Sequence, residues 1–283
     1  MKIAITGASG FIGAELVKYL SAHHSIIALK RTLSNAAGQN TEERRFDLTD
    51  ENTFNAFDDA EVLVHCAFIK ADKKNKHALQ TNIDATLKLA AICKQKNIHF
   101  VFLSSMSAHS DALSDYGKHK FNLEQKLDNS ATCVLKLGLV MGNSGGLYNT
   151  IQQTIAKSSV IPLISGGQQP IQVIHVSDLA KLTEKIAQQK ITGTYCVGSA
   201  KVYTLKYMYE AIAASLGKKI KFASLPFGFM RFSLTIAEGI GLTLPVTTEN
   251  LLGLKQLKAF DTQADLDSLQ ITLLSLEEAV TIS

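Results

Sequence analysis

This chain of 283 residues contains no tryptophan, four prolines and four cysteines. The cysteines lie far apart and form no CxxC pair, which argues against a zinc site and against a disulfide framework. We expect all four to be buried thiols of a protein in the reducing cytoplasm. The chain opens on a strand-like segment rather than on a charged segment followed by an apolar signal core, so secretion is not expected.

Long apolar runs are also missing. The most apolar region, residues 222–244, is interrupted by a proline, an arginine and a glutamate, so we expect no membrane span. The net charge of +4 is scattered, and no basic stripe or aromatic platform predicts nucleic-acid binding. One dense basic cluster consists of Lys70, Lys73, Lys74 and Lys76. It is interpreted either as a solvated loop or as an electrostatic lure for an anionic substrate.

Short apolar runs alternate with helical patterns through the first half of the chain. The predicted strands are residues 1–5, 26–29, 61–66, 100–103 and 133–137. The predicted helices between them are residues 51–57, 78–96 and 116–127. Continuous apolar strands that alternate with helices predict an α/β protein whose parallel sheet is covered on both faces. Right-handed crossovers then give a doubly wound sheet, the Rossmann fold.

In the second half, strands and helices alternate less regularly, because glycines and prolines break the chain into short mixed elements. Residues 193–197 are predicted as a strand that returns to the sheet, and residues 205–216 as a helix. We therefore expect a Rossmann domain over residues 1–145 and a smaller, interleaved C-terminal substrate-binding lobe over 146–283. Segments near 171–198 would return to the sheet. A cleft between the two parts would hold a small-molecule substrate.

A glycine-rich turn follows the first strand directly and precedes a helical pattern. Gly7 would allow the tight turn, Gly10 would let the backbone approach a phosphate, and Gly13 would let the helix pack close to the strand. The unpaired N–H groups of the first helical turn, at the positive end of the helix dipole, would then face an anion. This arrangement predicts that the turn binds the pyrophosphate of a dinucleotide.

Tyr116 and Lys120 are spaced by four residues, which places both side chains on one face of the predicted helix. Taken alone, the pair is typical of a helix surface. However, Ser104 and Ser105 end the apolar strand just upstream, and ligands of open parallel sheets bind beyond the carboxyl ends of strands. The serines are therefore expected where a ligand binds, and this favours a functional role for the nearby tyrosine and lysine over a surface pair.

These motifs together resemble the extended branch of the short-chain dehydrogenase/reductase superfamily, the NAD-dependent epimerase/dehydratase family. The resemblance runs over most of the chain and includes residues 47–50, 65–67, 81–86 and 174–178. It implies a set of cofactor-binding residues that covers the glycine turn, the strand ends and the catalytic helix. The set is Gly7, Ser9, Gly10, Phe11, Ile12, Gly13, Lys30, Arg31, Asp47, Leu48, Cys66, Ala67, Phe68, Asn82, Ser104, Tyr116, Lys120, Leu137, Gly138 and Val140.

The resemblance also implies catalytic roles. Tyr116 would exchange a proton with a substrate hydroxyl or carbonyl while hydride moves to or from the nicotinamide. Because a free phenol titrates near pH ~10, Lys120 and the oxidised nicotinamide would have to favour its phenolate. Ser105 would hold the substrate oxygen. The serine register stays open by one residue, because Ser107 follows closely. For Ser104 the preferred role is that of a strand-end hydroxyl that bonds the backbone.

The cofactor is expected to be NADP, with NAD as the alternative. We expect no acidic residue near the end of the second strand, where an NAD enzyme holds the ribose 2′-hydroxyl. Arg31 and Lys30 stand there instead and could pair with a 2′-phosphate; the alternative is that both are ordinary loop cations. Asp47 would contact the adenine, and its alternative role is that of a helix N-cap.

Two departures from the family pattern concern the substrate. Few residues separate Ser105 from Tyr116, and Ile171 takes the place of an arginine that neutralises a nucleotide diphosphate in many family members. After Arg45 the chain has a single arginine, Arg231, so a diphosphate clamp would need lysines instead. The lysines considered for this role are Lys157, Lys201 and those of the Lys70–Lys76 loop.

We therefore expect an NAD(P)-dependent oxidoreductase or epimerase that acts on a secondary alcohol or ketone of a sugar-like substrate, including nucleotide sugars. The alternative is a non-catalytic NADPH sensor or scaffold, because folds of this type are reused without chemistry. The resemblance implies a homodimer formed through the helices at 78–96 and 116–127.

Overall fold

The computed structural model describes residues 1–34, 38–70, 77–142, 145–240, 242 and 247–283. The chain divides into two compact units, each built from three segments. The first unit contains Met1–Ser104, Asn122–Lys136 and Val176–Tyr195. The second unit contains Ser105–Phe121, Leu137–His175 and Cys196–Ser283.

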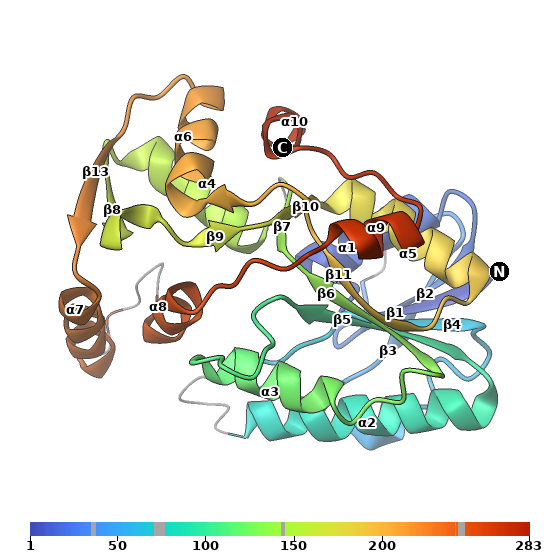
Figure 1. Cartoon of the computed structure of the whole chain (residues 1–283). Helices are drawn as coiled ribbons and strands as arrows, with labels where there is room; N and C mark the ends of the chain where they lie inside the picture. Colours follow the sequence, from blue (N-terminus) through green and yellow to red (C-terminus); the bar gives the residue numbers. More distant parts are fainter. Residues whose placement is uncertain (35–37, 71–76, 143–144, 241, 243–246) are drawn as a thin grey trace. The chain divides into compact units, whose positions relative to one another are not determined.

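A seven-stranded sheet forms the centre of the first unit, in the order β11-β6-β5-β4-β1-β2-β3 (Figure 1). Its strands are β1 (Lys2–Thr6), β2 (Ser25–Lys30), β3 (Thr41–Arg45), β4 (Val62–His65), β5 (His99–Ser105), β6 (Thr132–Leu137) and β11 (Gly193–Val197). The pairings of β1 with β2, β1 with β4, β2 with β3 and β4 with β5 are parallel. This strand order confirms the predicted doubly wound Rossmann fold, and β11 joins its edge as expected.

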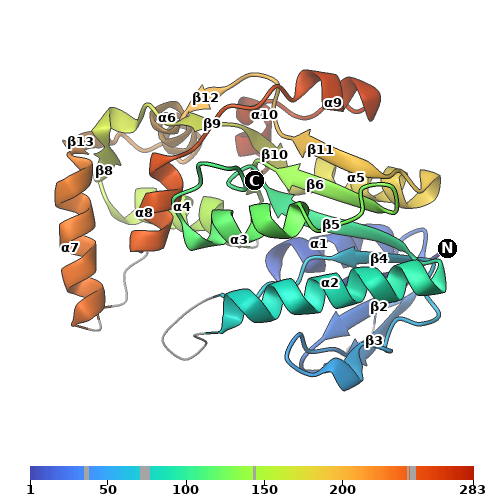
Figure 2. The same ribbon diagram turned by 60° about the horizontal axis from the view of Figure 1, so that its bottom comes forward.

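Helices cover both faces of this sheet. They are α1 (Phe11–Leu20), α2 (Ala78–Lys96) and α5 (Val176–Gln189). Helices α1 and α5 pack side by side on one face, and α2 runs along the other (Figures 1 and 2). Leu89 and Cys93 of α2 are fully buried in one cluster with Leu63 and Phe100 of the sheet. The predicted bounds of α2 are confirmed, because Asn97 takes a left-handed φ of 56° and ends the helix.

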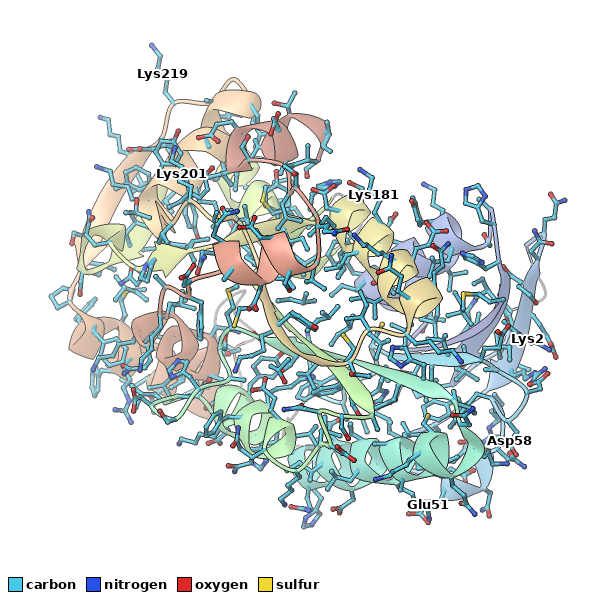
Figure 3. All side chains as sticks on the ribbon, turned by 45° about the vertical axis from the view of Figure 1, so that its right-hand side comes forward. Lys2, Glu51, Asp58, Lys181, Lys201 and Lys219 are labelled. Atoms are coloured by element: carbon cyan, nitrogen blue, oxygen red, sulfur yellow. The ribbon has the colours of Figure 1, made fainter. Side chains whose placement is uncertain are left out.

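Two elements of the first unit differ from the sequence predictions. The helix expected over residues 51–57 is only a 3₁₀ turn, Glu51–Thr53, and its cap is Asp50, which accepts the Asn52 N–H. Asp47 is therefore not the N-cap. Strand β3 was not predicted, because its sequence Thr-Glu-Glu-Arg-Arg has no apolar residue and it lies at the edge of the sheet. Charged side chains such as Glu51 and Asp58 extend outward from this unit (Figure 3).

The second unit is built around three strand pairs and a second apolar core. Parallel pairs join β7 (Leu139–Met141) with β10 (Val173–His175) and β8 (Val160–Ile164) with β13 (Lys221–Leu225), and an antiparallel pair joins β9 (Pro170–Ile171) with β12 (Tyr203–Thr204). The helices are α3 (Asp115–Glu124, which continues into the first unit), α4 (Gly146–Lys157), α6 (Leu205–Ser215), α7 (Phe227–Gly239), α8 (Thr248–Lys255), α9 (Gln263–Ser268) and α10 (Leu276–Ile282). Among the described residues, no helix combines the length and the apolar character that a membrane crossing requires.

Candidate active site

The glycine-rich turn joins β1 to α1 and touches the end of β4. Gly7 has a φ of +64°, and a Cβ at this position would lie 3.0 Å from two backbone atoms of Ala67. A Cβ on Gly13 would lie well inside 3.0 Å of the Gly7 carbonyl oxygen. Both positions therefore require glycine, for the reasons that the sequence suggested. Strand order reverses between β1 and β4, which is where doubly wound sheets bind dinucleotides.

The N-terminus of α1 carries no side-chain cap. Gly10 is its N-cap residue, and the Gly10 N–H closes the turn by donating to the Gly7 carbonyl over 2.8 Å. Ser9 and Gly10 are exposed, and Phe11 and Ile12 are half-buried. The first-turn N–H groups of a helix have no partner within the helix, so they can donate to phosphate oxygens. The described residues of this turn thus fit a dinucleotide pyrophosphate.

The sequence did not predict a hydrogen-bond network that lies next to the glycine-rich turn. The Thr6 hydroxyl accepts the N–H groups of Cys66 and Ala67, each over 3.1 Å, and lies 2.7 Å from His65 Nδ1. His65 Nε2 lies 3.0 Å from the Thr86 hydroxyl. Since the Thr6 oxygen already accepts two hydrogen bonds, its proton points to Nδ1. These contacts tie the ends of β1 and β4 to α2.

Asn82, whose structural role the resemblance implied, holds the backbone of the loop after β4. Its side chain accepts the Ile69 N–H and donates to the Ile69 carbonyl, each over 2.8 Å. Phe68 lies in the loop that this pair of hydrogen bonds fixes. Lys73, Lys74 and Lys76 of the basic cluster fall outside the described residues.

An acidic residue does stand at the end of β2, contrary to the reading of the sequence. Glu43 of the neighbouring strand β3 lies 2.5 Å from Lys30 Nζ and accepts both the N–H and the hydroxyl of Ser34. These bonds lower the pKa of Glu43 to about 2. Arg31 is exposed, and no ion pair engages it among the described residues. The two cations predicted here therefore differ: Lys30 is neutralised and Arg31 is not.

Two further predicted residues of the first unit are engaged locally. One carboxylate oxygen of Asp47 accepts the N–H and the hydroxyl of Thr49, over 2.9 and 2.8 Å, beside the buried Leu48. The buried Ser104 hydroxyl donates to Glu124, whose other oxygen lies 2.7 Å from Lys136 Nζ. Ser104 thus bonds a side chain rather than the backbone that was its expected partner.

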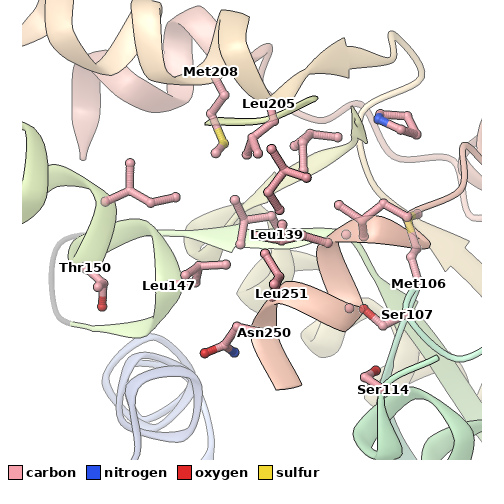
Figure 4. Close-up of a pocket in the computed structure, with 18 of the residues that line it drawn as sticks. Met106, Ser107, Ser114, Leu139, Leu147, Thr150, Leu205, Met208, Asn250 and Leu251 are labelled. Carbon is pink, nitrogen blue, oxygen red and sulfur yellow. The ribbon is translucent and has the colours of Figure 1, made fainter. Parts of the chain in front are cut away.

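A cavity of about 610 Å³ lies within the second unit. Ser105 and Tyr116 line it together with Leu137, Gly138 and Val140, so five of the predicted site residues meet around one space. Ser107 and Ser114 lie near each other at one side of the cavity, next to Met106, and the other labelled residues include four leucines together with Met208, Thr150 and Asn250 (Figure 4).

The segment before α3 sets the position of Tyr116. The Ser107 N–H donates to Ser105 Oγ over 3.1 Å, and the Gly117 N–H donates to Ser114 Oγ over 3.2 Å. A Cβ on Gly117 would overlap the Ser107 carbonyl oxygen, so α3 packs directly on this segment. Tyr116 is half-buried, and Lys120, one helical turn later on the same face, is buried.

Tyr209 is the second tyrosine among the described lining residues of the cavity. Burial raises the pKa of Tyr209 to about 12, so its phenol stays protonated at neutral pH. It is therefore poorly suited to act as a base. Lys157 and Lys201, considered as a diphosphate clamp, do not line the cavity, and Lys201 instead lies over the Tyr203 ring at 4.8 Å.

The fold and the glycine turn define a dinucleotide-binding protein. A model of the NAD dependent epimerase/dehydratase family matches residues 3–198, and the chain belongs to this family, as the resemblance indicated. The name of the family specifies NAD, which supports an NAD(P) cofactor.

Other proteins resemble this chain in sequence or in fold. An uncharacterized protein of Mycobacterium tuberculosis is 27% identical over 228 residues, which are 77% of this chain and 23% of that protein. The chain thus spans about a quarter of the length of that relative. The UDP-N-acetylglucosamine 4-epimerase from Bacillus cereus has a TM-score of 0.72 at 20% identity, covering 99% of this chain and 97% of that one. A human epimerase family protein with NADPH has a TM-score of 0.74 at 17% identity, covering 99% and 98%. At such identities the likeness shows the fold.

Proposed function

We propose that this protein is an NAD(P)-dependent oxidoreductase or epimerase that interconverts a secondary alcohol and a ketone. The observation that carries the proposal is the cavity wall of the second unit, which contains both Ser105 and Tyr116. The resemblance suggests a sugar-like substrate, and the Bacillus cereus structure belongs to an enzyme named for a sugar nucleotide. The family and the intact tyrosine, lysine and serine favour chemistry over a purely sensing role.

Each residue of the catalytic group has a separate task. A bound nicotinamide supplies or accepts the hydride. In reduction, Tyr116 donates its phenolic proton to the substrate oxygen, so that the ketone gains hydride and proton and becomes a secondary alcohol; oxidation runs the same exchange backwards. Lys120, buried on the same helix face, favours the phenolate through its positive charge. Ser105 donates a hydrogen bond to the substrate oxygen as negative charge develops.

The substitution Tyr116→Phe tests this assignment, with Tyr209→Phe as the matched control. Tyr116→Phe should lower kcat for reduction of a ketone panel by at least about 100-fold, the usual contribution of a general acid, while NADPH still binds. Tyr209→Phe removes a phenol from the same cavity and should change kcat less than about threefold. Equal turnover by the wild type and Tyr116→Phe on an identified substrate would rule out the mechanism.

We also propose that NADP is the preferred cofactor and that Arg31 pairs with its 2′-phosphate. Arg31 is exposed at the end of β2, whereas Lys30 is held by Glu43. Loss of a charge-assisted hydrogen bond costs about 1.5–3 kcal/mol, so Arg31→Ala should raise the Kd of NADPH roughly 10- to 100-fold and that of NADH less than about threefold. The site would instead be assigned to NAD if Glu43→Gln weakened NADH binding and Arg31→Ala left the Kd of NADPH unchanged.

A further inference from the structure

The wall of the cavity is almost entirely uncharged. Among its 32 described lining residues, Glu249 and Lys258 are the charged ones, and none is an arginine. Both charges already have partners on the protein: Glu249 accepts the Asp115 N–H over 2.9 Å, and Lys258 pairs with Asp111. The cavity therefore offers no uncommitted cation among the described residues that line it.

Three polar side chains away from Ser105 and Tyr116 are also engaged. Thr154 donates its hydroxyl to the Thr150 carbonyl over 2.8 Å, and Asn250 accepts the Thr247 N–H in the cap of α8. Gln172 donates to the Ser199 carbonyl and accepts the Phe260 N–H, over 3.0 and 2.8 Å. A polar ligand in this part of the cavity would lose bonds to water and find few replacements.

Most of the rest of the wall is aliphatic, and its residues come from at least seven elements, β8 and β9 included. Leu139 of β7, Leu147 of α4, Leu205 of α6, Leu234 of α7 and Leu251 of α8 all line the cavity, and four of these leucines are labelled in Figure 4. Ser107 and Ser114 lie at the opposite side of that view from Leu147 and Thr150. Two serines thus lie on one side of the cavity, and the other side is mostly aliphatic apart from Thr150 and Asn250.

We propose that the substrate is an apolar ketone or secondary alcohol without a phosphate group. Its oxygen binds at Ser105 and Tyr116, and its aliphatic body lies against the leucines of β7, α4, α6, α7 and α8. The inference rests on the proposed function, because it names the substrate class of that site. A nucleotide diphosphate would bring two negative charges into a wall whose one described cation is already paired. The volume of about 610 Å³ suits a drug-sized apolar molecule.

Helix α7 offers a matched pair of substitutions. Leu234 lines the cavity, whereas Ile236, two residues later, points elsewhere and is 48% exposed. Helix α7 contains no buried residue, so neither Leu234→Gln nor Ile236→Gln removes part of a core. The two variants differ in whether the new amide faces the cavity.

The probes are the methyl ketones from 2-butanone to 2-decanone, with UDP-N-acetylglucosamine as the competitor class. Binding to the full chain is measured by displacement of an apolar fluorescent dye; the chain has no tryptophan, so no tryptophan fluorescence overlaps the signal of the dye. Turnover is measured separately by NADPH oxidation. The Kd should fall roughly two- to fourfold for each added methylene. Leu234→Gln should weaken 2-decanone about tenfold and 2-butanone less than twofold, and Ile236→Gln should bind both like the wild type.

The inference is overturned if the Kd does not depend on the chain length of the ketone, or if Leu234→Gln and Ile236→Gln bind 2-decanone with the same Kd. It is also overturned if UDP-N-acetylglucosamine displaces the dye at a lower concentration than 2-decanone does. Length-dependent binding without turnover of any ketone by the NADPH-loaded protein would overturn the proposed function and leave the apolar ligand class standing. If the protein turned over UDP-N-acetylglucosamine and Tyr116→Phe abolished that turnover, the proposed function would stand and the apolar substrate class would be overturned.

Discussion

Replacement of Gly117 by alanine should damage catalysis more than stability. A Cβ at this position would overlap the Ser107 carbonyl oxygen and lie 2.9 Å from Ala112 Cβ and 3.1 Å from Ser114 Oγ. The nearest neighbour is backbone and cannot rotate away, so α3 and the Ser105–Ser114 segment must separate by about 0.5 Å or more. Overpacking of this size costs about 1–3 kcal/mol, partly offset by the roughly 1 kcal/mol gained when alanine replaces a helical glycine.

The catalytic effect is larger because the displaced segments carry Ser105 and Tyr116. A misplacement near 1 Å can cost about 100-fold in rate, so we expect kcat/KM for ketone reduction to fall roughly 10- to 100-fold. Over the same comparison the Tm should fall by no more than about 8 °C, at roughly 2–4 °C for each kcal/mol. The assays are NADPH oxidation and thermal unfolding of the same preparations.

Gly253→Ala is the control, because it changes the same residue type in a helix beside the same serine. A Cβ on Gly253 would meet Ser114 Oγ at 3.7 Å, an ordinary van der Waals distance. Although Gly253 also lines the cavity, this variant should lose far less activity than Gly117→Ala and should gain up to about 1 kcal/mol of stability. If Gly117→Ala were as active as Gly253→Ala, the packing of α3 would not be what positions Tyr116, and the reasoning would be refuted.

Two other predictions concern the first unit. Thr6→Val leaves the N–H groups of Cys66 and Ala67 without their acceptor, which costs about 1–3 kcal/mol of folding free energy, so Tm and NADPH affinity should both fall. Thr6→Ser keeps the hydroxyl and should retain both. Equal losses in the two variants would contradict this role of the hydroxyl. Burial raises the pKa of Cys133 to about 12 and that of Cys93 further, so neither should react with a thiol reagent until the protein unfolds. Because the unfolded thiols lose their protons above pH ~8.5 and the folded ones do not, stability should decline as pH rises from there; a flat profile in urea melts between pH 8 and 10 would contradict it.

Local features of the sequence were enough to predict where the glycine-rich turn needs glycine. The roles of Gly7 and Gly13 follow from contacts within a few residues of each other or with the adjacent strand end. The bounds of α2 likewise follow from its own pattern and from Asn97. Strand β3 carries no such pattern, because an edge strand can be polar throughout and is defined by its partner.

Long-range contacts explain what the sequence did not reveal. Glu43 reaches Lys30 because parallel pairing of β2 with β3 brings together residues 13 apart in the chain, so a search of the residues after β2 misses the carboxylate. Thr6 and His65 are 59 residues apart and meet only because β1 pairs with β4. The catalytic roles of Ser105, Tyr116 and Lys120 remain predictions that the proposed variants will test.

Ile171 connects the sequence departure with the substrate proposal. By resemblance, many family members place an arginine at this position to neutralise a diphosphate, and from sequence alone its absence only removes a candidate. In the structure Ile171 is 6% exposed, packs in the second core and lines the same cavity as Ser105 and Tyr116. Burying a charged guanidinium among these aliphatic neighbours without a partner would cost several kcal/mol, whereas isoleucine gains by burial. The substitution therefore does more than delete a phosphate contact: it extends the apolar wall that we propose selects the substrate.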